Sequence, residues 1–470
     1  MTSSYPAPTF RDPDGSLVLE DEHAVRTIRD SARLAVLRFI ESPLYQRLQQ
    51  RGDIVATTID DSPAGLVLFH PRIPVPTYPW EWTPSQWIAA ADLTLNLCQE
   101  ALREGWILKD ATPLNILFMG QRPVLVDVLS FDEHDPATSI WLPYGQYIRT
   151  FLLPLLMNRL LHWPLALSLF RRDGYEPAEL FAVLDWRQRF SRNAFWPITL
   201  PAWLERSGSS KSKPAARPPE ALQRGGDPDL ALHILESTLN KLRRQTHRAA
   251  PDLKRSDWSE YPAQLSHYTA EQSGNKRAWV REAIENLCPA RTLDIGANTG
   301  EYSVLVAETG AEVIALERDV ASADKIFRIS QSRKLPIQTI HADLARPTPA
   351  VGWDNNESSA LLTRLEGQFD LVLMLAVVHH LLLLEQIPLT AIAALCHRLT
   401  RRYLLLEWVP VSDPMFQELM RGREALYGSL HEDDFLAACN GLFTVLRRHT
   451  LGNGRLLLLL EKDPPAGASC

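Results

Sequence analysis

Residues 292–303 read TLDIGANTGEYS, and this stretch decides the fold of the C-terminal half of the chain. A short apolar strand carries an acidic residue, Asp294, and a turn with Gly296 and Gly300 then leads into a helix from Glu301. Glycine at such a turn lets the backbone come close to a ligand that a Cβ atom would exclude. The stretch therefore predicts the first strand–turn–helix of an open α/β sheet, in which ligands bind at the carboxyl ends of the strands.

Beyond Arg291 the sequence alternates short apolar runs with helical segments. Such alternation indicates a largely parallel sheet that is covered on both faces. The last two runs are joined by HTLGNG, whose Asn453–Gly454 pair is typical of a hairpin. We expect a seven-stranded, mostly parallel sheet that ends in an antiparallel hairpin. The seven runs are TLDIG, EVIALE, IQTIHAD, FDLVLML, YLLLEWV, FTVLRR and RLLLLLE.

Two further acids follow the next two strands. Glu317 closes EVIALE, 21 positions after Gly296, and Asp343 closes IQTIHAD. A dinucleotide site would have Gly-x-Gly-x-x-Gly, with a pyrophosphate on the helix N-terminus. Here Asn298 replaces the second glycine, and an acid precedes the first. An acidic site suits a cofactor with an ammonium and a sulfonium group and no phosphate.

The segments DIGANTG, GEYS, LERD, HADL and FDLVLMLAVVHHL together resemble class I S-adenosylmethionine-dependent methyltransferases. The resemblance implies a Rossmann-like fold with S-adenosylmethionine as the cofactor. Glu317 would then accept the ribose hydroxyls and Asp343 would face the adenine amino group, although Asp343 could instead be a helix N-cap or loop residue. Asparagine at position 298 departs from the commoner glycine, but it tolerates unusual φ better than most residues. The implied cofactor-binding residues are Asp294, Gly296, Asn298, Gly300, Glu317 and Asp343.

His379 and His380 stand at the predicted end of the fourth strand, in LAVVHHLLL. In this fold the segment after the fourth strand borders the transferring methyl group, so these side chains can reach an acceptor. Histidine has a reference pKa of about 6.5 and is suited to general-base catalysis near neutral pH. Both are therefore candidate catalytic residues. In the alternative interpretation both are structural, one capping the next helix and one buried with a hydrogen-bond partner.

The length of 470 residues suits two domains. We place an α+β domain at 1–205, a flexible linker rich in Ser, Lys, Pro and Gly at 206–228, a helical lead-in at 229–290 and the methyltransferase domain at 291–465. Leucines at 232, 235, 239 and 242 predict an amphipathic helix in the lead-in. A basic cluster follows. It indicates either a solvated helix end, where the helix dipole favours cations, or a surface that attracts an anionic substrate. Its members are Lys241, Arg243, Arg244, Arg248, Lys254 and Arg255.

The N-terminal half contains WILKDATPLNILFMGQRPVLVDVLSF, in which Asp110, Asn115 and Asp127 have the spacing of a kinase catalytic loop and the strand after it. No lysine precedes Lys109, no glycine-rich loop is present, and Val128 follows Asp127 where kinases have phenylalanine. Three interpretations follow: a degenerate kinase-like scaffold, an unrelated fold with coincidental spacing, and an active phosphotransferase.

Most of the chain resembles a bacterial group of long methyltransferase-like proteins related to nodulation host-specificity proteins. The segments that carry this resemblance are HPRIPVPTYPWEW, LKDATPLNILF, PVLVDVLSF and EWVPVSDPM. The resemblance implies an architecture and leaves the reaction open. The proline- and aromatic-rich segment from His70 is interpreted as a stiff, packed surface loop, or alternatively as an aromatic wall for a substrate.

Several classes of function are disfavoured. A net charge of -7 argues against a dedicated nucleic-acid binder. The five cysteines are scattered, so we expect neither a metal site nor a disulfide framework. The N-terminus does not read as a signal peptide, and the apolar stretch from Tyr147 is broken by prolines and polar residues, which predicts buried helices and no membrane span. We expect a cytoplasmic protein.

The sequence thus predicts methyl transfer from S-adenosylmethionine to a small-molecule or glycan acceptor. Two alternatives stay open: a non-catalytic binding or scaffold protein that retains the fold, and a phosphotransferase that acts through Asp110. The sequence indicates neither the acceptor atom nor the oligomeric state.

Overall fold

The structure is a computed structural model that describes residues 12–207, 227–251, 253 and 269–464. The chain forms two compact units, each described by itself. The first unit comprises Met1–Asp252 and Val351–Ser358, and the second comprises Leu253–Ala350 and Ser359–Cys470. Most of the expected linker, 206–228, lies outside the described residues.

The first unit begins with a four-stranded antiparallel sheet in the order β1-β2-β4-β3. Between β2 and β3 the chain forms α1 (Asp30–Ile40) and α2 (Pro43–Arg51). The Ser42 side chain caps α2 by accepting the Tyr45 N–H at 3.2 Å, and Gly52 ends the helix in a left-handed conformation. The strands are β1 (Gly15–Leu19), β2 (His23–Ile28), β3 (Thr58–Ser62) and β4 (Gly65–Pro71).

The remainder of this unit is mainly helical around α3 (Pro84–Leu102), which begins at a capping box made by Thr83 and Gln86. Two short antiparallel pairs flank the turns that contain the kinase-like residues: β5 (Trp106–Leu108) with β8 (Phe131–Glu133), and β6 (Ile116–Met119) with β7 (Arg122–Leu125). The later helices of the unit are α4 (Tyr144–Tyr147), η4 (Ile148–Leu152), α5 (Leu153–Leu161), η5 (Leu165–Phe170), α6 (Pro177–Val183), α7 (Trp186–Arg189), η6 (Phe195–Thr199), α8 (Leu200–Ser207) and α9 (Pro228–Ala249).

The interpretation of the segment from His70 to Trp82 as a stiff, packed surface loop holds only for its first part, where Pro71, Arg72 and Pro74 are exposed. Trp80 and Trp82 are buried in the core of the unit, and the indole N–H of Trp82 donates to the Thr77 hydroxyl at 3.1 Å. Two large indoles bury enough apolar area to outweigh the usual preference of proline-rich segments for the surface.

The apolar stretch from Tyr147 forms π-, α- and 3₁₀-helical turns, and its central part is buried as expected. Within the described residues, no helix has both the length and the apolar character needed to cross a bilayer.

The helix α9 groups with the first unit, whereas the sequence suggested a lead-in to the second. Its buried face includes Leu235, Leu239 and Leu242. The Tyr147 and Thr246 hydroxyls also share a buried hydrogen bond of 2.9 Å. The apolar seam was therefore predicted correctly, but its packing partner could not be read from the helix alone.

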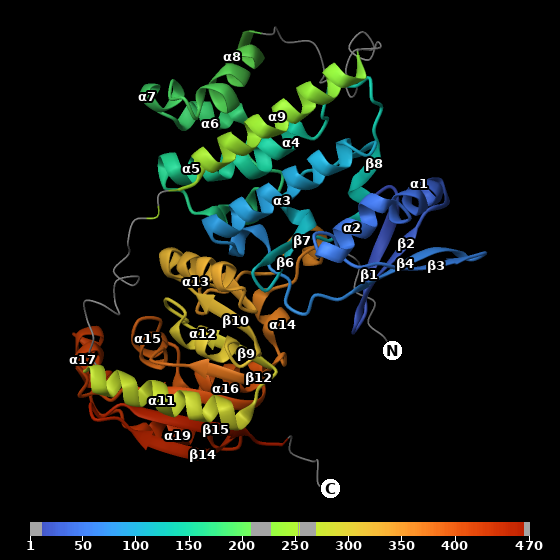
Figure 1. The fold of residues 1–470 in the computed structure, drawn as a ribbon. Helices are drawn as coiled ribbons and strands as arrows, with labels where there is room; N and C mark the ends of the chain where they lie inside the picture. The colour runs from blue at the N-terminus through green and yellow to red at the C-terminus, as the bar shows by residue number, and fades with distance from the viewer. Residues whose placement is uncertain (1–11, 208–226, 252, 254–268, 465–470) are drawn as a thin grey trace. The chain divides into compact units, whose positions relative to one another are not determined.

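The second unit is an α/β sandwich around a seven-stranded sheet in the order β11-β10-β9-β12-β13-β15-β14 (Figure 1). The pairs within β11-β10-β9-β12-β13 are parallel, and β15 is antiparallel to both β13 and β14. The hairpin turn contains Gly454, at φ 82°. The strands are β9 (Arg291–Ile295), β10 (Glu312–Glu317), β11 (Ile337–His341), β12 (Phe369–Met374), β13 (Thr400–Trp408), β14 (Phe443–Thr450) and β15 (Leu456–Lys462).

Successive side chains of each strand point to opposite faces of this sheet, and most are buried, so both faces are apolar. On one face, Val280, Val306 and Ile326 from α11, α12 and α13 join a core cluster with alternate residues of the strands. On the other, Cys396 of α16 contacts Met374 of β12. The helices are α11 (Ala270–Leu287), α12 (Glu301–Ala307), α13 (Val320–Arg333), α14 (Leu361–Leu365), α15 (Val378–Leu383), α16 (Leu389–Leu399), α17 (Pro414–Met420), α18 (Glu424–Tyr427) and α19 (Glu432–Cys439).

Candidate functional site

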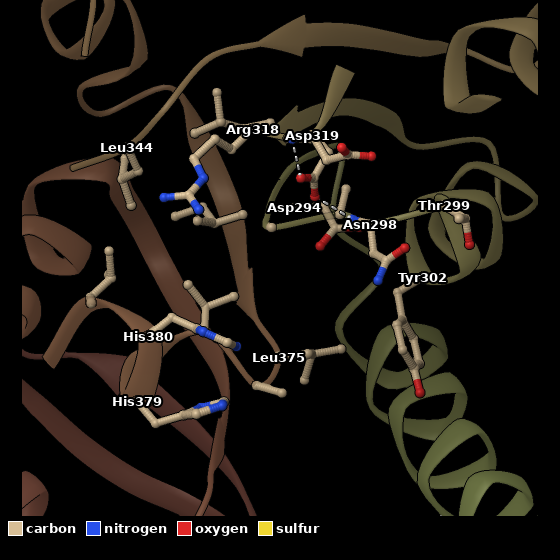
Figure 2. Close-up of a pocket in the computed structure, with 18 of the residues that line it drawn as sticks. Asp294, Asn298, Thr299, Tyr302, Arg318, Asp319, Leu344, Leu375, His379 and His380 are labelled. Atoms are coloured by element: carbon tan, nitrogen blue, oxygen red, sulfur yellow. Dashed lines mark hydrogen bonds between the residues drawn. The ribbon is translucent and has the colours of Figure 1, made fainter. Parts of the chain in front are cut away.

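A cavity of about 570 Å³ lies in the second unit, where β9, β10 and β12 end (Figure 2). Its position is where ligands of open α/β sheets bind. Seven of the eight residues singled out in the sequence line it, and Gly300 does not. The seven are Asp294, Gly296, Asn298, Glu317, Asp343, His379 and His380.

The turn between β9 and α12 approaches the cavity with its backbone. Gly296 has φ 68°, and a Cβ atom there would lie 2.6 Å from Cγ2 of Val377. Gly300, at φ 84°, forms the N-cap position of α12, and a Cβ atom there would lie 3.0 Å from Ile326. Gly300 therefore permits the turn and the helix packing without reaching the cavity.

Asn298 adopts a left-handed conformation with φ 48°, which asparagine tolerates better than most residues. Its backbone N–H donates to Oε2 of Glu317 at 2.7 Å. Its side-chain Oδ1 is buried and has no hydrogen-bond partner among the described residues. A buried acceptor without a partner is costly, so this oxygen marks a position that a ligand donor could satisfy.

Asp294 is buried in β9, beside the turn. Its Oδ2 accepts a hydrogen bond from the Ser303 hydroxyl at 2.6 Å. Burial disfavours the charged carboxylate and raises the pKa of Asp294 to about 6, while the Ser303 hydrogen bond opposes this shift. A cationic ligand group in the cavity would favour the ionised form.

Glu317 ends β10, and both of its carboxylate oxygens are already used. Oε2 accepts the Asn298 N–H and Oε1 accepts the Asp319 N–H, both at 2.7 Å (Figure 2). Burial raises the pKa of this carboxyl, and the two backbone donors oppose the shift. The sequence did not reveal these bonds. They hold the carboxylate in a defined orientation, and each oxygen retains a further lone pair.

Asp343 lies after β11 and is held at the rim of the cavity. Its Oδ1 accepts the Ala345 N–H at 2.9 Å, and its Oδ2 lies 3.3 Å from an Arg346 nitrogen. Arg346 and Arg318 also pair with Glu385, at 2.6 and 3.4 Å. Asp343 therefore stabilises its loop, as in the alternative interpretation of the sequence, and it also lines the cavity.

The two histidines lie in α15, not at the end of the strand. The strand β12 ends at Met374, and the chain passes through Ala376 at φ 57° before His379 and His380 form part of the helix. Figure 2 shows both imidazole rings directed into the cavity, across from Asp294 and Asn298. Their ring centroids are 4.2 Å apart.

The two imidazoles differ in their surroundings. His379 is 3% exposed, and among the described residues neither ring nitrogen has a hydrogen-bond partner. Burial, with His380 and Arg455 nearby, lowers the pKa of His379 well below its usual value. Burial also lowers the pKa of His380, to about 4. Both rings are therefore neutral near pH 7, and His379 has no described hydrogen-bond partner of the kind expected for a structural buried histidine.

A buried network of charges reaches the cavity through Lys276 and Arg455, and sequence reasoning missed it. Glu407 of β13 pairs with Lys276 of α11 at 2.6 Å and with Arg455 at 3.4 Å. Arg455 also pairs with Asp413 at 2.8 Å. Lys276 lies 5.0 Å from the centroid of the Tyr302 ring. Only Glu407, an acid at the end of a predicted strand, carried a local signal; the other members come from distant segments.

In the first unit, the structure brings Asn115 and Asp127 together. The Asn115 side chain donates to Oδ2 of Asp127 at 3.5 Å and to the Ser130 hydroxyl at 3.0 Å. Arg26 of β2 is buried and pairs with Asp127 at 2.9 Å. Burial and the nearby Asp127 raise the pKa of Asp110. A cation thus contacts Asp127 even though no lysine precedes Lys109.

Among the described residues, no three His, Cys, Asp or Glu side chains are placed to share a metal ion. The four described cysteines, Cys98, Cys288, Cys396 and Cys439, are free thiols. The fifth, Cys470, lies outside the described residues.

The sequence was compared with protein-family models and with known proteins. No protein-family model matches it. It is 30% identical to nodulation protein NoeA of Rhizobium meliloti (strain 1021) over 472 residues, which cover 97% of this chain and 96% of NoeA.

Two solved structures are similar to parts of the chain. The N-methyltransferase NodS from Bradyrhizobium japonicum WM9, in complex with S-adenosyl-L-homocysteine, is 12% identical over 43% of this chain and 92% of NodS, with a TM-score of 0.32. Magnesium protoporphyrin IX methyltransferase (ChlM) from Synechocystis PCC 6803 is 19% identical over 41% of this chain and 84% of ChlM, with a TM-score of 0.29. Because the identity to NoeA extends over nearly the whole of both sequences, the chain belongs to the NoeA family of nodulation proteins.

Proposed function

We propose that the second unit binds S-adenosylmethionine in the cavity at the strand ends and transfers its methyl group to a small-molecule or glycan acceptor. The observation that carries this proposal is the set of acids around the glycine turn: Asp294, Glu317 and Asp343 follow one another on β9, β10 and the loop after β11, and all line one cavity. A cofactor that carries an ammonium and a sulfonium group matches this donor set, whereas a pyrophosphate would be repelled by it.

The residues present fit such a cofactor. The backbone at Gly296 occupies space that a Cβ atom would obstruct, and the buried Asn298 Oδ1 has no partner among the described residues. Asp294 and Asn298 would hold the amino-acid part of the cofactor. Glu317, held by two backbone N–H groups, would accept the ribose hydroxyls, and Asp343 would face the adenine.

When bound, the cofactor supplies a methyl group that its sulfonium already activates, so the protein contributes mainly alignment. His379 is the residue that we assign to proton removal from the acceptor. Its ring is directed into the cavity, it is neutral near pH 7, and neither nitrogen has a partner among the described residues. A neutral imidazole can accept a hydrogen bond from an acceptor hydroxyl in the cavity. Because its lowered pKa makes it a weak base, it takes the proton only as the oxygen bonds to the methyl group and becomes strongly acidic.

The charges beside His379 favour a hydroxyl over an ammonium as the acceptor group. Glu407 is already paired with Lys276 and Arg455, and Asp413 with Arg455. These carboxylates are therefore compensated, and a cationic amine would gain little from them. A neutral hydroxyl, as in a sugar or a small alcohol, needs only the hydrogen-bonding capacity that His379 offers.

The experiment is untargeted mass spectrometry of metabolites from a strain that carries the gene and from its deletion strain. We expect species that are heavier by one methyl group only in the first strain, and their loss when Asp294→Asn replaces the wild type. If the intact protein binds S-adenosylmethionine but no methylated species depends on it, the chain is a non-catalytic binding protein and the proposal of methyl transfer fails.

A further inference from the structure

The first unit carries an exposed aromatic surface that the methyl-transfer site does not use. Its large apolar side chains come from α7, the loop after it, η6 and α8, and their exposed fractions are far above those of core residues. We call this set the aromatic surface: Trp186 (68% exposed), Phe190 (54%), Trp196 (54%), Trp203 (40%) and Leu204 (64%).

Three of these side chains, Phe190, Trp196 and Trp203, form a connected group through Phe195. The ring centroids of Phe190 and Trp203 are 5.6 Å apart. Phe195 bridges the group, because its ring lies 5.6 Å from Trp196 and 6.2 Å from Trp203. Figure 1 shows α6, α7 and α8 gathered beside α9. A connected set of exposed aromatic residues marks an interaction site more often than scattered apolar residues do.

Cations border the aromatic surface. Lys241 of α9 lies 4.9 Å from the centroid of the Trp196 ring, and the Arg187 guanidinium lies 5.3 Å from that of Trp186. Within the described part of the chain, the exposed Lys and Arg side chains of α7, α8, α9 and the segment between α7 and α8 make no ion pair. They are Arg187, Arg192, Arg206, Lys241, Arg244 and Arg248. The last three belong to the basic cluster noted in the sequence.

The charge balance of these segments is positive in a chain whose net charge is -7. Residues 185–206 contain four arginines against two acids, Asp185 and Glu205, and α9 contains one lysine and three arginines against Asp229 and Glu236. Cations are therefore in excess in both segments, which is the complement of an anionic surface.

The sequence that follows α8 is poor in large apolar residues. Residues 208–226 read GSSKSKPAARPPEALQRGG, with Leu222 as their single large apolar residue. They also add cations. A partner with apolar depth and negative charge would instead satisfy both features, and an anionic bilayer has both: aromatic side chains favour its headgroup region, and Arg and Lys its charged surface.

We propose that the first unit docks on an anionic lipid bilayer through the aromatic surface, with Trp186 and Trp196 entering the headgroup region and the bordering cations contacting lipid phosphates. The docking is peripheral, since no described helix could span a membrane. It does not depend on the methyl-transfer proposal, because all of its residues lie in the first unit.

The test is co-sedimentation of the intact chain with vesicles of phosphatidylcholine alone and of phosphatidylcholine mixed with phosphatidylglycerol. We expect binding to the mixed vesicles only, weakened by added salt. The double variant Arg187→Gln/Arg192→Gln should bind at least tenfold more weakly, since each cation near such a surface contributes about fivefold. Trp186→Gln/Trp196→Gln should also lose at least tenfold. The control Arg29→Gln/Leu34→Gln alters an exposed cation and an exposed leucine on or next to α1, and should bind as wild type.

Circular dichroism and thermal unfolding establish that each variant is folded. Equal sedimentation with and without phosphatidylglycerol would overturn the proposal. Loss of binding in the arginine variant with none in the tryptophan variant would also contradict it, because the aromatic residues would then not enter the bilayer. A third outcome would also overturn the proposal: wild type self-associates in sedimentation velocity, the tryptophan variant is monomeric, and neither protein binds vesicles. The aromatic surface would then be an interface between copies of the chain.

Discussion

At the scale of single residues, the cavity contains buried polar groups that lack hydrogen-bond partners among the described residues, which a purely structural role does not explain. A buried donor or acceptor without a partner costs roughly 1–3 kcal/mol. His379 has two such nitrogens and Asn298 has one such oxygen among the described residues. Asp294 is a buried carboxyl that forms no ion pair with any other described residue. These costs are understandable if a ligand provides the missing partners.

His379→Leu separates function from structure. Because the leucine removes two unpartnered buried nitrogens, we expect the free energy of unfolding to stay the same or rise by about 1 kcal/mol. Turnover should fall by roughly 10²–10⁴-fold, the usual contribution of general acid–base catalysis. Cofactor affinity should barely change. The measurements are chemical denaturation, calorimetry and turnover once an acceptor is known.

His380→Leu provides a comparison within the same helix, because it removes the second imidazole of the cavity and leaves His379 in place. Strong destabilisation by His379→Leu would show that the imidazole has a structural partner, and full turnover would leave alignment alone as the mechanism.

The raised pKa of Asp294 predicts that the free energy of unfolding depends on pH. Its pKa rises from 3.8 to about 6 on folding, so the folded chain favours the protonated form. The stability that this group contributes is therefore full below about pH 4 and is lost as the pH rises through about 6, a change on the order of 3 kcal/mol. Asp294→Asn should lack this loss, so its free energy of unfolding should rise relative to wild type across that interval.

Urea denaturation at a series of pH values checks this difference, with Asp433→Asn on α19 as an exposed control. Parallel pH profiles for wild type and Asp294→Asn would refute the assignment. The same pKa implies that cofactor affinity falls as the pH drops through about 6, since the ionised carboxylate is the form that attracts a cation.

At the scale of elements, the turn between β9 and α12 joins the fold to the site. The sequence predicted this strand–turn–helix, because glycine spacing and a strand-end acid are local signals. It placed His379 and His380 at a strand end, whereas three residues of loop separate β12 from α15. The network of Lys276, Glu407 and Arg455 could not be predicted, since its members meet only through the pairing of β13 with β15 and the packing of α11.

Gly296→Ala tests the close approach of this turn. Both Gly296, at φ 68°, and Gly310, at φ 94°, have backbones that disfavour alanine, at a cost of about 1 kcal/mol. Only at Gly296 would the new Cβ atom also meet a neighbour, Val377, at 2.6 Å, whereas nothing lies within 4 Å at Gly310. We expect Gly296→Ala to be destabilised by about 1–3 kcal/mol and to lose cofactor affinity.

The matched control, Gly310→Ala, should lose only the backbone term and keep its affinity. Thermal unfolding and calorimetry on the two variants give the comparison. Equal losses of stability and of affinity in both variants would mean that Val377 moves to accommodate the new Cβ atom. The close approach of the backbone at Gly296 would then not be required for cofactor binding.

At the scale of the whole molecule, two units of different kind occupy one chain. The α/β class of the second unit followed from alternating strands and helices. The first unit was harder to predict, because its burial depends on contacts between distant segments: Trp80 and Trp82 enter the core from a proline-rich segment, and α9 joins the unit across the expected linker. The kinase-like spacing of Asp110, Asn115 and Asp127 stays a prediction, with a degenerate scaffold, a coincidence of spacing and an active phosphotransferase as its three interpretations.

We expect the intact chain to show no Mg²⁺-dependent thermal shift with ATP. The Asp127 carboxylate already accepts the Ser130 hydroxyl at 2.7 Å and pairs with Arg26 at 2.9 Å, so a metal ion would have to displace both. Differential scanning fluorimetry with Mg-ATP checks this. A clear shift that Asp127→Ala abolishes would show that the first unit binds nucleotide.

The central claim is cofactor binding by the second unit, and isothermal titration calorimetry of the intact chain with S-adenosylmethionine tests it most directly. Wild type should bind, and Glu317→Ala should lose about 1.5–3 kcal/mol, or roughly 10- to 150-fold in affinity, as for charge-assisted hydrogen bonds. Glu312→Ala, at the exposed start of the same strand, should bind as wild type. Unchanged affinity in Glu317→Ala would contradict the ribose assignment, and no heat of binding with wild type would contradict the claim itself.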